Sequence, residues 1–274
     1  MGKPRSDWNW NTYYRRIKDG RGQGTLADYL PWLTIHDLAS LGVVSRVLGF
    51  TTGRIHHLLS GYETAFFYIL DASPKALDIR EQFPLLPLED TLRIATELGI
   101  WHPRDPVSKY PRVFTSDFVV TTPGGLVVRS VKPSLELDKQ RTADKLAVER
   151  RYWEEKGIEW RLVTEKEINF QKARNLEWVY RAWDYPERLP EGKTAEELTA
   201  FFLDLYNHTH CSIEEIATRT ENCFHLEPGF GISTYQYLLL HQRITADLSH
   251  PLDFASARID AGKGGAYSWI ETIA

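Results

Sequence analysis

The stretch SDFVVTTPGGLVVRSVKP, residues 116–133, decides the fold of the N-terminal part of this 274-residue chain. It predicts two apolar strands, near 112–122 and 126–133, joined by a tight turn. The first strand contains the acid Asp117, and the second ends at the base Lys132. Because the strands of a hairpin lie side by side, the sequence brings this acid and this base into the same small sheet.

The turn decides whether these side chains share a face of the hairpin. If Pro123-Gly124 forms a two-residue loop, Asp117 pairs with Ser130, and if Gly124-Gly125 forms it, Asp117 pairs with Lys132. In both cases all three side chains lie on one face, because alternate residues of a strand point the same way. A three-residue loop would shift the register by one and separate them.

Three interpretations of Asp117 and Lys132 stay open at this point. A solvent-exposed ion pair contributes only about 0–1 kcal/mol and is common. A buried structural pair has to overcome the cost of removing both charges from water. In a metal-dependent nuclease site, the carboxylate binds a divalent cation and the ammonium group positions the attacking water.

Carboxylates on the flanking helices favour the nuclease interpretation. Glu63 shares a helical stripe with apolar residues at offsets of three and four, and Glu149 does the same in a later helix. The apolar neighbours are Leu59, Phe66, Phe67 and Leu70 for Glu63, and Leu146 and Trp153 for Glu149. A carboxylate that faces a sheet is costly unless it is paired or bound to metal, although either acid can also reach water at the edge of its stripe. Carboxylates and a lysine that face one sheet are typical of a Mg²⁺ site.

The order of the expected elements predicts an α/β fold with a mixed sheet. The elements are a helix over 56–71, a strand over 75–86, a helix over 88–98, the hairpin, a helix over 138–156 and a strand over 160–164. Before them, residues 13–24 predict a short helix and a loop.

A polar segment over 169–193 predicts a domain boundary, which divides the chain into 1–169 and 170–274. Beyond it, capping boxes start two helices, Thr194 with Glu197 and Ser212 with Glu215. A third helix near 233–243 and short strand-like runs at 243–248 and 256–262 predict a winged-helix-like domain.

Composition limits the classes of function. The net charge of −4 argues against a simple DNA-coating protein, but the first 60 residues are rich in Lys and Arg and the last hundred are rich in Asp and Glu. We therefore expect DNA phosphates at the N-terminal part, contacted by Arg15, Arg16, Lys18, Arg21, Arg150 and Arg151. Two cysteines, no membrane-length apolar run and no apolar leader indicate a cytoplasmic protein with no membrane partner.

Several segments together resemble the TnsA endonucleases of heteromeric Tn-seven-type bacterial transposons. They include RRIKDGRGQG, DYLPWLT, TGRIHHLLSGYE, LDIREQFPLL, TSDF, VKP, AVERRYW and EKEIN, in the order of the family and over most of 13–170. The resemblance implies a restriction-endonuclease-like PD-(D/E)xK core followed by a winged-helix-like C-terminal domain for partner binding.

The resemblance also implies roles for individual residues. Glu63, Asp117 and Lys132 correspond to catalytic residues, with Glu63, Asp117 and the Val131 carbonyl as ligands of Mg²⁺, for which Mn²⁺ can substitute. The family usually has Glu, Asp or Gln two residues before the lysine, whereas this chain has Ser130, which makes Ser130 a possible accessory residue. Glu149 falls at a matching acidic position with an accessory role.

By resemblance, the enzyme cuts the 5′ ends of a transposon during excision. Its partners would be transposon-end DNA, the DDE-type transposase subunit TnsB and the AAA+ ATPase regulator TnsC. Two alternatives remain: a catalytically decayed adaptor that binds DNA or protein, which Ser130 supports, and a free-standing nuclease, which the acidic C-terminal part disfavours.

Overall fold

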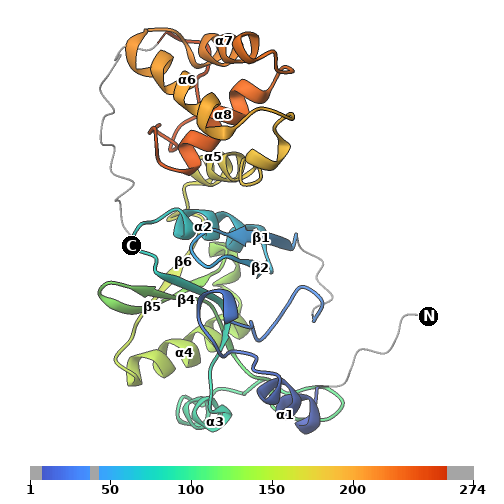
Figure 1. Ribbon diagram of the computed structural model, residues 1–274. Coiled ribbons are helices and arrows are strands. Elements are labelled where there is room, and N and C mark those ends of the chain that lie inside the picture. Colours follow the sequence, from blue (N-terminus) through green and yellow to red (C-terminus); the bar gives the residue numbers. More distant parts are fainter. Residues whose placement is uncertain (1–7, 38–42, 258–274) are drawn as a thin grey trace, which may run out of the picture. The chain divides into compact units, whose positions relative to one another are not determined.

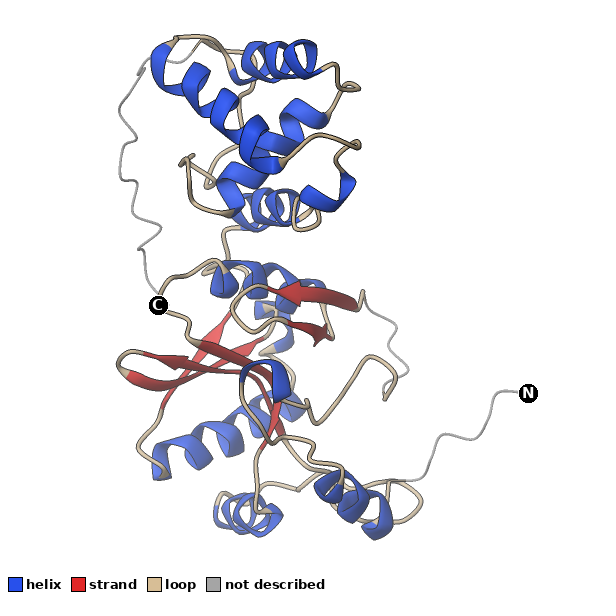
Figure 2. Ribbon diagram, viewed as in Figure 1, coloured by secondary structure: helices blue, strands red, loops and turns tan. Residues whose placement is uncertain are grey.

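The computed structural model describes residues 8–37 and 43–257, which form two compact units that divide after Ile168 (Figure 1). The first unit combines helices with strands, and the described part of the second unit contains only helices and loops (Figure 2). No helix in the described part of the chain is long and apolar enough to cross a bilayer.

The centre of the first unit is a mixed four-stranded sheet. Its order is β3 (Asp78–Pro84), β4 (Thr115–Thr122), β5 (Gly125–Val131) and β6 (Glu159–Val163). β3, β4 and β5 pair antiparallel, whereas β6 runs parallel to β5. A parallel pair needs a long crossover, and α4 (Gln140–Glu155) provides it. The predicted mixed α/β architecture is confirmed.

The hairpin of β4 and β5 uses the shorter of the expected loops. Thr122 pairs with Gly125, so Pro123 and Gly124 form a two-residue turn. The paired residues run from this turn to Phe118 opposite Arg129, and the continuation of the same register places Asp117 opposite Ser130. Of the two same-face registers, the one that pairs Asp117 with Ser130 is therefore correct.

Alternation along the strands gives the sheet two apolar faces. Val119 and Val128 pack with residues of α3 (Leu88–Glu97) and α4, including Ile94 and Trp153, in one core. The neighbouring Phe118 points to the opposite face, where it contacts aromatic side chains of α2 (Gly61–Asp71). Asp117 has the same parity as Val119, so it lies on the face covered by α4.

The segment before α2 differs from its prediction. Residues 54–58 do not begin a helix but form strand β2 (Arg54–Leu58), which pairs with β1 (Ser45–Gly49). α2 starts only at Gly61, because the Ser60 side chain caps the helix by accepting from the Glu63 amide. The N-terminal helix is α1 (Trp10–Lys18), as expected from the sequence.

The described part of the second unit contains four α-helices, α5 (Phe170–Tyr180), α6 (Ala195–His208), α7 (Ile213–Phe224) and α8 (Phe230–Leu240), and one short 3-10 helix, Pro186–Arg188. Both predicted capping boxes start helices, α6 at Thr194 and α7 at Ser212. α5 lies in the segment that was predicted to be a polar domain boundary. This segment forms a helix because Ala173, Leu176 and Val179 give it one buried apolar face.

The strands expected for a wing are not found in the described part of the second unit. Residues 243–248 form turns and loop instead, since Ile244 and Leu248 are buried without any ladder partner. The run expected at 256–262 extends beyond residue 257 and so lies mostly outside the described residues.

Candidate active site

Asp117 and Lys132 meet in the first unit. The Asp117 carboxylate accepts from the Lys132 ammonium at 2.7 Å and from the Val131 amide at 2.7 Å. The Lys132 ammonium also donates to the Val131 carbonyl at 2.9 Å. Asp117 is buried and the Lys132 side chain is one-third exposed, so the pair opens to solvent on one side. Burial lowers the pKa of Lys132, but the charges of Asp117 and Glu63 outweigh it, so the pKa is raised and the amine stays charged.

Glu149 approaches the same place from α4. Its carboxylate accepts from the Ser130 hydroxyl at 2.5 Å, and that hydroxyl also accepts from the Trp160 indole at 3.1 Å. Burial, followed by the negative charge of Asp117, raises the pKa of Glu149 to about 7. The prediction that Glu149 shares a buried stripe with Leu146 and Trp153 is confirmed. The carboxylate next to Ser130 therefore comes from Glu149 of α4 and not from a residue of β5.

Glu63 is held at the start of α2. One of its carboxylate oxygens accepts from the Leu59 amide at 3.0 Å and the other from the Ser60 hydroxyl at 2.9 Å. Burial and the charge of Asp117 raise the pKa of Glu63, while Lys132 acts in the opposite direction. Asp117 and Lys132 therefore each act electrostatically on Glu63 and on Glu149, although these acids come from separate helices.

Gln82 is a residue of this site that the sequence analysis missed. It lies in β3 opposite Asp117, and its amide donates to Glu63 at 3.2 Å and accepts from the Thr115 hydroxyl at 3.1 Å. Its φ of 47° is in the left-handed region, which is unfavourable for a residue with a side chain. A single glutamine in a strand gives no signal of either property.

We expect Gln82→Gly to be more stable than Gln82→Ala by about 1 kcal/mol. Both variants lose the hydrogen bond to Glu63, but only glycine removes the strain of the positive φ. Thermal unfolding of the two variants measures the difference directly. A more stable alanine variant would show that the backbone at this position is not strained.

The site opens into a cavity of about 980 Å³. Asp117, Lys132 and Glu149 line it together with a set of basic side chains from α1, α4 and the loop before β4. These bases are Arg16, Arg104, Arg112, Arg141 and Lys145. A cavity that combines several cations with two buried acids suits a polyanionic ligand better than a neutral one.

The donor set fits a hard divalent cation. It consists of carboxylate oxygens of Asp117, Glu149 and Glu63 and the Val131 carbonyl, which are ligands that Mg²⁺ prefers. Within residues 8–37 and 43–257, no group of three or more His, Cys, Asp or Glu side chains is gathered closely enough to form a ready-made metal site. The Lys132 ammonium instead bridges Asp117 and the Val131 carbonyl.

The basic residues predicted from sequence to contact DNA lie in different places. Arg16 lines the cavity, but both Arg16 and Arg21 are ion-paired with Asp37, at 2.6 and 2.7 Å. Arg150 and Arg151 lie on the exposed side of α4, where they pair with Glu154 and Glu155. Arg15 and Lys18 are exposed on α1.

Four bases of the cavity were not predicted, namely Arg104, Arg112, Arg141 and Lys145, and the last two lie on α4. Arg141 and Lys145 are one helical turn apart on α4, and Glu149 follows one turn later. The spacing 141, 145, 149 is visible in the sequence and would have placed both bases on the side of the helix that carries the acid.

Comparisons with known proteins identify relatives of this chain. Residues 73–165 match the family described as TnsA-like endonuclease N terminal, and residues 167–248 match TnsA endonuclease C terminal. The chain belongs to the TnsA-like endonuclease family. It is also 45% identical over 183 residues to the Transposon Tn7 transposition protein TnsA of Escherichia coli, and the match spans 66% of this chain and 66% of that relative. The first of the two family matches contains Asp117, Lys132 and Glu149, whereas Glu63 precedes it.

Proposed function

We propose that this TnsA-like chain is a Mg²⁺-dependent DNA endonuclease subunit of a transposase, which hydrolyses phosphodiesters at the 5′ ends of a transposon during excision. One observation carries the proposal. Asp117 and Lys132 are in direct contact at a basic cavity, and two further buried carboxylates act on them electrostatically. The first unit would then be a restriction-endonuclease-like catalytic domain.

Asp117, Glu63, Glu149 and the Val131 carbonyl would hold the metal ion. When bound, Mg²⁺ lowers the pKa of water and neutralises charge on the scissile phosphate. The lysine contributes a fixed positive charge, because the pKa of its amine is raised and Asp117 orients it at 2.7 Å. We infer that Lys132 stabilises the negative charge that develops on the phosphate, as preorganised donors do in other active sites.

The supporting residues have separate tasks. Ser60 and Gln82 fix the Glu63 carboxylate, and Ser130 fixes the Glu149 carboxylate. Each of these neutral partners satisfies an acid without neutralising it. None of them adds a positive charge that would repel a cation.

The test of this function uses the full chain together with the transposase and the ATPase of its own element. The substrate is a plasmid that carries the two transposon ends of the element in which this chain is encoded. We expect breaks at the 5′ ends with Mg²⁺ or Mn²⁺ and none with EDTA, mapped by primer extension. Breaks that persist in EDTA would contradict the metal dependence.

A decayed adaptor is the second candidate, and Ser130 in place of an acid is the observation that favours it. Its prediction is that the transposition complex assembles but no 5′ break appears with any divalent metal. The contact between Ser130 and Glu149 supports the active form instead, because it supplies a carboxylate at that position.

The partners follow from the family and from the charge of each part of the chain. We propose that the first unit binds transposon-end DNA and that the acidic second unit binds protein, with a TnsB-like transposase and a TnsC-like ATPase as partners. Coexpression with each partner separately, followed by affinity purification of residues 169–274 and of the full chain, tests the assignment. Retention of both partners by a chain that ends at residue 168 would contradict it.

A further inference from the structure

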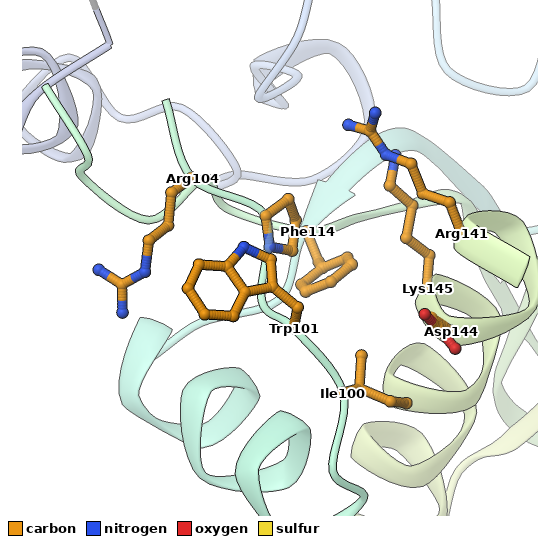
Figure 3. Close-up of a pocket in the computed structure, with 8 residues that line it drawn as sticks. Ile100, Trp101, Arg104, Phe114, Arg141, Asp144 and Lys145 are labelled. Atoms are coloured by element: carbon orange, nitrogen blue, oxygen red, sulfur yellow. The ribbon is translucent and has the colours of Figure 1, made fainter. Parts of the chain in front are cut away.

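A second, smaller pocket of about 350 Å³ lies in the first unit beside the catalytic cavity. It is lined by residues of the segment after α3 and of the first half of α4: Ile100, Trp101, Pro103, Arg104, Phe114, Arg141, Asp144 and Lys145 (Figure 3). Pro103, Arg104, Phe114, Arg141 and Lys145 line the catalytic cavity as well. The two spaces therefore share a wall.

Trp101 is the most unusual side chain of this pocket. It is 81% exposed, although tryptophan is one of the largest apolar residues, and it stacks on no other aromatic ring within the described residues. Figure 3 shows its ring between Arg104 and Phe114. Phe114 is buried and packs edge-on against His102, so the floor of the pocket is fixed while the Trp101 ring presents a free face.

The bases beside Trp101 differ from the other bases of α4. Arg150 and Arg151 each have an acidic partner, Glu154 and Glu155. In the part of the chain that the structure describes, no acidic side chain forms an ion pair with Arg141 or Lys145.

Arg141 and Lys145 also repel each other. Like charges one helical turn apart destabilise a helix, and here the charge of Arg141 helps to lower the pKa of Lys145, after the larger effect of burial. Asp144, the one acid among the described lining residues, accepts instead from the Gln140 amide at 2.7 Å. In Figure 3 both basic side chains extend away from Asp144. An arrangement that is unfavourable in the free protein becomes favourable when an anion binds.

We propose that this pocket binds one unpaired nucleotide of the DNA strand next to the cleavage site, with its base stacked on Trp101 and its phosphates on Arg141 and Lys145. The proposal rests on the function proposed above and deepens it. Base stacking on an aromatic face requires a base that has left the duplex, and a pocket of this volume accommodates one nucleotide rather than a double helix. The shared wall connects the bound nucleotide to the phosphate in the catalytic cavity.

DNA binding in EDTA tests the proposal, because it needs no cleavage. The probes are a fluorescein-labelled duplex with flush ends and the same duplex with a tail of about five unpaired nucleotides, measured by fluorescence anisotropy. We expect the wild-type full chain to prefer the tailed duplex, Trp101→Ala to lose about tenfold in affinity for it, and Trp101→Phe to retain most of the affinity. The affinity for the flush duplex should change little in either variant.

Charge variants provide the second readout. The double variant Arg141→Gln, Lys145→Gln should bind the tailed duplex more weakly. The slope of log K against log salt concentration should become less steep by about one to two. Lys166→Gln, which removes an exposed charge outside both cavities, is the matched control and should behave as wild type.

The outcomes separate the two proposals. Equal binding of tailed and flush duplexes by the wild type, or an unchanged tail preference in Trp101→Ala, would overturn the nucleotide pocket even if the chain cleaves DNA. A tail preference that depends on Trp101 in a chain that never cleaves would support the pocket and refute the nuclease function. Because Trp101 is exposed, its replacement is not expected to unfold the chain, and circular dichroism confirms the fold of each variant.

Discussion

Asp117→Asn is expected to reduce DNA strand cleavage at least about 1,000-fold while the chain remains folded and binds DNA. Asparagine keeps the size of the side chain and can still accept from the Val131 amide. It removes the negative charge that orients Lys132 and that would bind the metal ion. Primer extension at the transposon ends, with the transposase and ATPase present, measures the loss.

Two further variants make this prediction specific. Lys132→Ala should show a similar loss, whereas Glu97→Gln, which removes an exposed acid of α3, should cleave as the wild type does. Each variant is checked for DNA binding in EDTA, so that a loss of binding is not mistaken for a loss of chemistry. Cleavage by Asp117→Asn within about tenfold of the wild type would remove Asp117 from the active site.

Glu81→Gln is expected to lower the free energy of unfolding by about 3 to 5 kcal/mol near neutral pH. Glu81 is fully buried and accepts from the Arg54 guanidinium at 2.8 and 2.5 Å. It also accepts from the His57 amide and contacts the His56 ring at 2.8 Å. These contacts join the β1–β2 hairpin to β3, and the variant leaves the buried Arg54 charge without its counter-ion.

The same residue predicts how stability depends on pH. Burial alone would raise the pKa of Glu81, but His56 and Arg54 lower it from about 4.5 to about 2. Because the pKa is lower in the folded protein, the stabilisation is complete above about pH 4.5 and is lost as the pH falls toward 2. Above that pH, the lowered pKa of Glu81 contributes about 3 kcal/mol to the free energy of unfolding.

Urea unfolding between pH 2 and pH 7 measures both effects. The stability of Glu81→Gln should fall less steeply over this acid range than that of the wild type, whereas Glu97→Gln should follow the wild type. Parallel curves for Glu81→Gln and the wild type would show that Glu81 does not carry the acid sensitivity.

Most of the secondary structure around the candidate site was predictable from local sequence. The Pro-Gly turn and the alternating strands fix the hairpin, because turn geometry and burial together select one register. The apolar stripe of α4 places Glu149 on the buried face of the helix. Capping boxes mark α6 and α7, because these motifs act within one turn of the chain.

Local patterns failed where a distant contact decides the structure. The helix predicted over 56–71 includes residues 56–58, yet these belong to strand β2, because Arg54 and His56 bind Glu81 more than twenty residues away. Residues 169–180 look like a linker, yet one face of α5 is buried in the second unit.

The sequence by itself determined the mixed sheet and the residue types of the site: an acid and a lysine on one hairpin, and acids on the two flanking helices. Only the tertiary structure decided which groups meet. It brought Glu149 to Ser130, placed the strained Gln82 beside Glu63, and left Arg141, Lys145 and Trp101 around one pocket. The reason is that periodicity fixes the face on which a side chain lies, whereas its partners depend on how separate elements pack.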